Sequence, residues 1–117
     1  MPETQEDSIF TKIIKREAAA EILFEDDEMI AINDIRPKAP VHVLIISKEQ
    51  IPSLNECTEQ HVELLGRMML RAKAIAAEKG IAATGYKVVN NVGEDGGQII
   101  KHFHLHLLGG EPVKTLV

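Results

Sequence analysis

The sequence predicts an α+β fold, in which a five-stranded antiparallel sheet packs against one long helix and a short helix precedes them. Three segments carry this prediction. Residues 58–80 place apolar side chains at helical spacing, residues 42–47 are nearly all apolar and β-branched, and residues 101–108 alternate along a candidate strand. The chain of 117 residues has the length of one domain, so we expect a single domain over 1–117.

The N-terminal part of the chain predicts a short helix and a hairpin. Residues 1–7 are polar and are expected to be disordered. Ser8 is a candidate N-cap for the short helix over 9–16. The segments 20–26 and 29–34 are candidate strands joined by an acidic turn, which indicates a hairpin.

The rest of the chain supplies the long helix and three further strands. Thr58 can cap the helix and Gly80 can end it, and Leu65 and Met68 open the apolar stripe along it. The predicted order is a proline-containing loop over 36–40, a strand over 42–47, the helix over 58–80, a strand over 86–91, a glycine-rich loop over 92–98 and a last strand over 101–108.

Composition limits the classes of partner and the compartment. The formal net charge of -5 argues against a nucleic-acid backbone as the main partner, because phosphate neutralisation needs a basic face. Cys57 is the only cysteine, so an intramolecular disulfide is impossible and a reducing compartment is expected. No apolar run approaches the roughly 18 residues of a membrane span, and the first residues are acidic and polar, unlike a signal peptide. We therefore expect a cytoplasmic protein without a membrane partner.

Three histidines alternate with apolar residues at the end of the chain. On a strand, His102, His104 and His106 share one face, and the apolar residues between them face the core. The histidine face must then open to a cleft or solvent, or lie under a lid that gives each ring a partner. The triplet is compatible with a chance polar face, a metal site, or acid–base and nucleophilic catalysis, and taken alone it leaves metal binding and catalysis open.

The glycine-rich loop directly before the histidines favours phosphate chemistry. Its glycines allow backbone N–H groups to converge on an anion, and Asn91 and Gln98 add neutral amide donors. Such a loop suits a phosphate group and offers nothing to zinc. Without the adjacent histidines, the same loop would be more typical of a hairpin turn.

These residues resemble a known family. Asn91-Val-Gly93, Gly97-Gln98 and the run from His102 to Gly110 resemble the histidine triad (HIT) superfamily. Residues 24–48 are similar to its histidine triad nucleotide-binding (HINT) branch, and the resemblance extends from about Ser8 to Gly110. It implies a HIT-like fold, a homodimer paired through helices and sheet edges, and purine nucleotide substrates, with no metal or other cofactor.

The resemblance also implies a role for each histidine of the motif. His104 would be the nucleophile that takes the nucleotidyl group. His106 would contact the phosphate and help to protonate the leaving group. His102 would orient His104 or support the phosphate site. His42 matches a fourth histidine that is thought to belong to a proton relay. The activity implied is that of a purine nucleoside phosphoramidase, which hydrolyses the P–N bond of nucleotide 5′-phosphoramidates.

The nucleotide would be held by residues from both halves of the chain. Asn91, Gly97 and Gln98 match positions at the phosphate, together with His104 and His106, and Asp34 matches the acidic residue at the ribose. The apolar residues that match the walls around the purine base are Ile9, Phe10, Ile13, Ile32, Ile35 and Leu44.

Several of these residues also fit purely structural roles. On pattern alone Ile32, Ile35 and Leu44 would be core residues, Asp34 could close an Asx turn, and His42 could be an isolated histidine at a strand edge. Outside the motif, we expect His61 to be a surface residue and Cys57 to be structural.

The sequence departs from the family at two places. Ile99 stands where many relatives have Ser or Thr, which removes a hydroxyl near the leaving group. The tail after Gly110 lacks the arginine often found there and the aromatic residue of the animal proteins. The first departure favours a rival function, a dimeric nucleotide-binding adaptor with slow incidental hydrolysis. A zinc protein is a third possibility.

Overall fold

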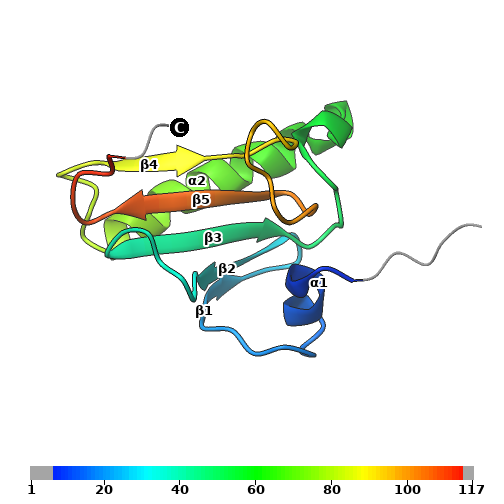
Figure 1. Ribbon diagram of the computed structural model, residues 1–117, viewed down its shortest axis with the longest axis horizontal. Helices are drawn as coiled ribbons and strands as arrows, with labels where there is room; N and C mark the ends of the chain where they lie inside the picture. The colour runs from blue at the N-terminus through cyan, green and yellow to red at the C-terminus, as the bar shows by residue number, and fades with distance from the viewer. Residues whose placement is uncertain (1–6, 115–117) are drawn as a thin grey trace, which may run out of the picture.

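The structure is a computed structural model that describes residues 7–114, and it forms a sheet flanked by helices (Figure 1). Its five strands are all antiparallel and lie in the order β1-β2-β3-β5-β4, which confirms the predicted α+β fold. The elements in chain order are α1 (Ile9–Ile14), β1 (Ile22–Glu25), β2 (Met29–Asn33), β3 (Val41–Ser47), the 3₁₀ helices η1 (Leu54–Glu56) and η2 (Glu59–His61), α2 (Val62–Glu78), β4 (Tyr86–Val89) and β5 (His104–Gly109).

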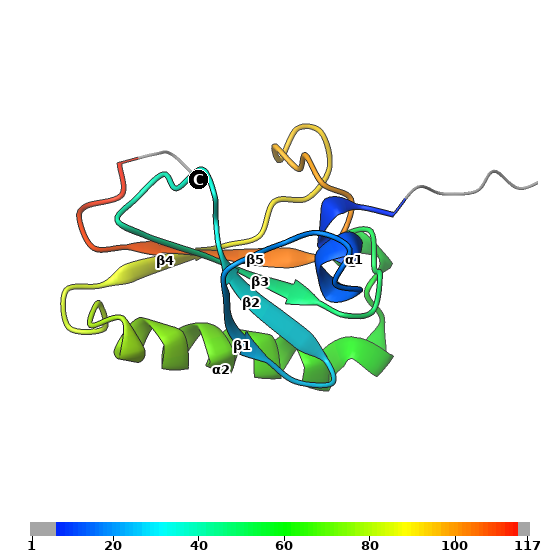
Figure 2. The same cartoon turned by 90° about the horizontal axis from the view of Figure 1, so that it is seen from below.

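The two faces of the sheet bury two separate apolar clusters. Figure 2 shows α2 running along one face, while α1 lies on the other. Alternation along β3 divides its side chains between them: Val43 and Ile45 pack in the cluster with α2, and Leu44 and Ile46 pack in the cluster with Phe10 of α1. The nearly continuous apolar run of β3 is therefore explained by a strand that is covered on both faces.

The observed elements differ from the predicted ones mainly at their ends. The predicted long helix is interrupted at its start, because Thr58 caps the 3₁₀ turn η2, and α2 begins only at Val62. Along α2 the buried stripe starts with Leu64, whereas Leu65 is only partly buried. Of the segment expected to be disordered, residues 1–6 lie outside the described part of the chain, and Asp7 forms an ion pair with Lys15 at 2.9 Å.

The last strand begins later than the alternation predicts. Pairing of β5 with β3 starts at His104, which lies opposite Ile46. His102 and Phe103 precede the strand, and the Phe103 backbone binds Ile51 and Ser47 instead. Within residues 7–114, no helix has the length and apolar character that a membrane crossing requires.

Candidate active site

The three histidines of the C-terminal motif lie on one face of the sheet, the face that also carries α1. His102 is fully buried, His104 is 7% exposed and His106 is partly buried. The intervening side chains pack in the opposite cluster against α2, which confirms the predicted division of faces: Phe103, Leu105 and Leu107. The histidine face is partly covered by α1, so the rings have partners rather than open solvent.

Partners on both sides of the ring fix the tautomer of His102. Its Nε2 lies 2.6 Å from the carbonyl oxygen of Ser47, so Nε2 carries the proton and donates. Its Nδ1 must then accept, and the hydroxyls of Ser8 and Thr11 lie 3.1 Å and 3.3 Å from it. Ser8 is the N-cap of α1, and Thr11 lies in its first turn.

His104 is oriented by the backbone of its neighbour. Its Nδ1 lies 2.6 Å from the carbonyl oxygen of His102, so Nδ1–H donates and the lone pair resides on Nε2. Asn90 donates from Nδ2 to the carbonyl of His104 at 2.9 Å, and the ring of Phe10 lies edge-on with its centroid 4.8 Å from that of His104. A neutral imidazole with a free Nε2 lone pair is the form that a nucleophile requires.

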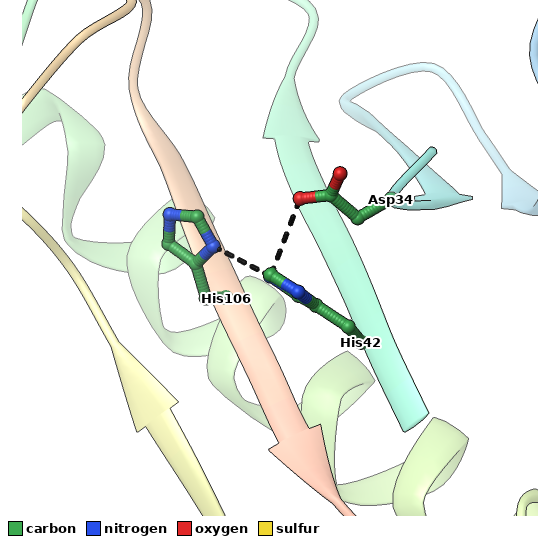
Figure 3. A group of neighbouring side chains, drawn as sticks. All are labelled: Asp34, His42 and His106. Atoms are coloured by element: carbon green, nitrogen blue, oxygen red, sulfur yellow. Dashed lines mark hydrogen bonds and ion pairs between the residues drawn. The ribbon is translucent and has the colours of Figure 1, made fainter. Parts of the chain in front are cut away.

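His42 and His106 form a hydrogen-bonded pair across β3 and β5 (Figure 3). The amide N–H of Lys38 donates to His42 Nδ1 at 3.1 Å, so the His42 proton resides on Nε2. That nitrogen lies 2.9 Å from His106 Nδ1 and 3.4 Å from Asp34 Oδ2. His106 therefore accepts at Nδ1 and carries its own proton on Nε2. The hydrogen bond joins His42 to the three histidines of the motif, and its part in a proton relay stays a prediction.

The same three side chains form the candidate metal cluster among the described residues. One ligand atom from each of Asp34, His42 and His106 lies within 4.8 Å of the others. A metal-binding histidine normally donates its second ring N–H to an acceptor. Here the second nitrogen of His42 accepts an N–H from Lys38, which leaves a proton on the nitrogen that would face the ion. These three side chains therefore suit proton transfer better than coordination of a metal ion.

Burial keeps the four imidazoles neutral. Desolvation lowers the pKa of His42, His102 and His104 from the ordinary value, and Asp34 opposes this for His42 and His104. Desolvation, followed by the neighbouring His104 and His42, lowers the pKa of His106 to about 4. The free base is the main form of each ring at neutral pH. A bound anion would act in the same direction as Asp34 and raise these pKa values.

The loop before β5 is shaped by its glycines and by the two predicted amides. Gly93 has a positive φ of 69°, and a Cβ on Gly96 would overlap the carbonyl oxygen of Val92. Gln98 accepts from the Gly93 amide at 2.9 Å and donates from Nε2 to the carbonyls of Pro52 and Ile100 at 2.7 Å and 3.1 Å. Gln98 therefore holds the loop in place.

Asn91 has a similar part in the loop. It donates from Nδ2 to the carbonyl of Gly96 at 2.8 Å, and Gly97 takes a positive φ of 80°. In the structure both amides serve backbone carbonyls, and their contact with a phosphate stays a prediction.

The predicted base pocket is brought together only in part. Four of the six residues lie in the cluster beneath α1: Phe10, Ile13, Ile32 and Leu44. Ile9 is 46% exposed and Ile35 is 87% exposed, so neither belongs to that cluster. Ile35 is therefore not the core residue that pattern alone suggested, and its contact with a base stays a prediction.

Asp34 forms the Asx turn that the sequence suggested, and it also contacts His42, which was not predicted. Its Oδ1 accepts from the Arg36 amide at 2.8 Å, which is an Asx turn, and its Oδ2 faces His42. Its contact with a ribose stays a prediction.

The two residues outside the motif have structural partners. His61 accepts at Nδ1 from the Thr58 amide at 2.9 Å and pairs with Glu49 at 3.1 Å, so it completes a capping box. Cys57 is partly buried against the α2 cluster, and burial followed by the charges of Glu49 and Glu56 raises the pKa of its thiol. A thiol with a raised pKa is a poor nucleophile.

Sequence reasoning missed several contacts of the site. Ser8 was identified only as a helix cap, and Thr11, Asn90 and the backbone of Lys38 were not singled out. The hydroxyls of Ser8 and Thr11 carried a weak signal, because they fall three residues apart at the start of a helix and so share a face. The contacts of Lys38 and of the Ser47 carbonyl involve backbone atoms, for which side-chain identity gives no signal.

Comparison with known proteins agrees with this geometry. The family model described as scavenger mRNA decapping enzyme C-term binding matches residues 7–114. The chain is 45% identical over 112 residues to a purine nucleoside phosphoramidase of Escherichia coli, covering 96% of this chain and 94% of that protein. It is 51% identical over 105 residues to an uncharacterised HIT-like protein of Synechococcus elongatus, covering 90% and 91%.

A solved structure also shows the similarity to histidine triad proteins. A HIT family hydrolase from Clostridium thermocellum superposes with a TM-score of 0.91 at 44% identity, covering 97% of this chain and 99% of that one. An α+β fold of this topology with four histidines on one face defines a protein of the histidine triad type. The chain belongs to the HIT superfamily.

Proposed function

We propose that this protein is a purine nucleoside phosphoramidase, a hydrolase that cleaves the P–N bond of nucleotide 5′-phosphoramidates and releases AMP or GMP. The observation that carries the proposal is the hydrogen-bond geometry of the site, which assigns the lone pair of His104 and the proton of His106 to Nε2. The ring centroids of these two residues are 5.0 Å apart, so one phosphate can contact both. The named activity of the E. coli relative supports the same reaction.

The first step forms a bond from His104 Nε2 to phosphorus and breaks the P–N bond. The negative charge of the substrate opposes the desolvation that keeps His106 neutral, so His106 takes up a proton on binding. That proton passes to the departing nitrogen, which leaves as the amine. The positive charge of the nucleotidyl-histidine is stabilised by its Nδ1–H, which donates to the His102 carbonyl.

The second step releases the nucleotide. His106, now neutral, accepts a proton from water as the water oxygen attacks phosphorus and the bond to His104 breaks. His106 returns this proton to solvent when the mononucleotide departs, which restores the neutral free protein. His42 donates to His106 Nδ1 and lies beside the Asp34 carboxylate, so charge on the pair is shared and stabilised. Two smaller displacements replace one difficult one, which is the usual benefit of a covalent intermediate.

The nucleotide would lie across the face that carries α1. The purine base contacts the apolar cluster around Phe10, the ribose approaches Asp34, and the phosphate lies by the loop that contains Gly97. The net charge of -5 leaves a single nucleotide as a more suitable partner than a nucleic acid. The cytoplasm stays the predicted compartment.

We also propose that the protein acts as a homodimer. Large apolar side chains on α2 are exposed: Val62 is 63%, Met69 50% and Leu70 64% accessible. Tyr86 is also exposed, and it lies on β4, the strand at one edge of the sheet. Exposed apolar side chains on a helix and on an edge strand favour association of two copies through both elements.

A specific observation favours the rival function of a nucleotide-binding adaptor. Ile99 is 92% exposed at the position where many relatives carry a hydroxyl, so the leaving group receives no proton from this side chain. An adaptor should bind AMP and hydrolyse phosphoramidates barely at all.

Steady-state hydrolysis of adenosine 5′-phosphoramidate, followed by release of AMP, separates the two functions. We expect sustained turnover that His104→Ala abolishes without loss of the folded state. His61→Gln is the matched control, because His61 lies outside the site and glutamine suits its place in the capping box. AMP binding without turnover in the unaltered protein would favour the adaptor.

A further inference from the structure

Two hydroxyl groups connect the start of α1 to His102 of the candidate active site. The Ser8 hydroxyl lies 3.1 Å from His102 Nδ1 and 3.2 Å from the Thr11 hydroxyl, which itself lies 3.3 Å from the same nitrogen. Ser8 Oγ also accepts from the Thr11 amide at 3.1 Å, as the N-cap of α1. The cap of the helix and the contact with the triad are therefore one hydrogen-bonded unit.

His102 needs these hydroxyls because it is fully buried. Its Nε2–H is committed to the Ser47 carbonyl at 2.6 Å, so Nδ1 is left as an acceptor inside the protein. An unpaired buried acceptor is unfavourable, and the ring would have to turn or α1 would have to move away. A turn of the ring would break the bond to Ser47, and a shift of α1 would leave the ring free to turn.

The carbonyl of His102 is the group that orients the nucleophile. It accepts from His104 Nδ1–H at 2.6 Å, and this bond leaves the His104 lone pair on Nε2. His102 precedes the paired part of β5, so the sheet ladder does not hold this residue. Its peptide unit is held on one side by the Phe103 amide, which donates to Ile51 at 2.6 Å, and on the other by the His102 side chain.

We propose that Ser8 and Thr11 are positioning residues of the reaction, whose hydroxyls fix His102 so that its carbonyl holds His104 with Nε2 directed at phosphorus. The proposal rests on the phosphoramidase function proposed above. Neither residue touches the substrate; both act through His102. Because α1 also supplies Phe10 to the apolar cluster beside His104, docking of this helix completes the binding surface and the orientation of the nucleophile together.

Kinetics distinguish positioning from a merely structural role. In Ser8→Ala/Thr11→Val, we expect kcat to fall about tenfold, the effect of losing one or two neutral hydrogen bonds, while KM and the Kd for AMP stay within about twofold. Thr11→Val alone keeps the helix cap, because the cap bond uses the Thr11 amide and Ser8 Oγ. This variant should lower kcat less than the double variant, because Ser8 still donates to His102 Nδ1. Thr11→Ser should recover kcat. The matched control is Thr58→Val, which removes a cap hydroxyl from η2 and should leave kcat unchanged.

The opposite pattern would overturn the proposal. If the hydroxyls serve only to hold α1 as a wall of the nucleotide site, KM and the Kd for AMP rise and kcat stays constant. An unchanged kcat in the double variant, with or without a change in KM, means that the Phe103 amide alone positions the His102 carbonyl.

Ring-nitrogen NMR tests the proposal without any turnover. In ¹⁵N-labelled protein, His104 should be found as the Nδ1–H tautomer, and the double variant should show a mixture of tautomers and a displaced His102 Nδ1 resonance. An unaltered His104 in the double variant would contradict the positioning role. If the unaltered protein proves inactive on phosphoramidates while the NMR change is seen, the proposed function fails and the positioning contact stands.

Discussion

Acidification should destabilise this protein strongly, because the histidines of the site are buried as neutral rings. The perturbation is a fall in pH from about 7.5 to about 5.5, and the quantity measured is the free energy of unfolding. An unfolded histidine titrates near pH 6.5, whereas the pKa of folded His106 is lowered to about 4 by desolvation and by His104 and His42. Stability is therefore present above about pH 6.5 and lost as the pH falls toward about 4.

The size of this loss in stability depends on how many more protons the unfolded chain binds than the folded protein as the pH falls. One histidine with a folded pKa well below 5.5 loses about 1.4 kcal/mol of stability over this interval. Partial exposure of His106 reduces its share to about 1 kcal/mol. The pKa values of His42, His102 and His104 are lowered in the same direction, so these residues add to the loss. A loss of about 1 kcal/mol or more is a sizeable share of the roughly 5–15 kcal/mol of a typical domain.

Urea unfolding at a series of pH values measures this loss. His106→Asn should lower the slope of the unfolding free energy against pH by the equivalent of about one proton. The titration is made without nucleotide, because a bound anion would raise the pKa values of the rings and obscure the loss. A free energy of unfolding that is flat over this interval, or that rises on acidification, would refute the assignment of neutral buried imidazoles.

Three substitutions test other parts of the site. Gly96→Ala places a Cβ against the carbonyl oxygen of Val92, so the glycine-rich loop before β5 must shift, and calorimetry should show AMP binding weakened about tenfold or more. Ile99→Ser supplies a hydroxyl near the leaving group and should raise kcat severalfold with little change in KM; an unchanged rate would show that this departure does not limit turnover. Phe10→Leu removes the edge-on contact with His104 and should lower stability by about 1 kcal/mol and raise KM. A wild-type KM in that variant would remove Phe10 from the base site.

Periodicity was sufficient to predict the architecture of this chain. The alternation around His104 indicated both a strand and the face on which the histidines lie, and the stripe around Met68 indicated the helix that covers the other face. These signals are local, because they depend only on which side of a strand or helix a residue occupies. The ends of elements were less predictable, since the 3₁₀ turn after Thr58 and the late start of β5 at His104 depend on hydrogen bonds to other segments.

The hydrogen bonds that connect the side chains of the site could not be predicted from the sequence pattern. The bond between His42 and His106 joins residues 64 positions apart, and the bond between Ser8 and His102 joins residues 94 positions apart. Both depend on the register of β3 with β5 and on where α1 docks, which no local signal determines. The motif resemblance identified the histidines, but the protonated nitrogen of each ring follows only from its neighbours, among them the Lys38 amide.

Mass spectrometry of the trapped intermediate tests the central claim most directly. The protein is mixed with adenosine 5′-phosphoramidate and quenched within the first turnover under conditions that preserve P–N bonds. It is then digested, and the modified peptide and residue are identified. We expect one adenylyl group on the peptide that contains the histidine motif, located on His104 and absent from His104→Ala. Turnover with the adduct on another residue, or turnover that persists in the His104→Ala variant, would contradict the account.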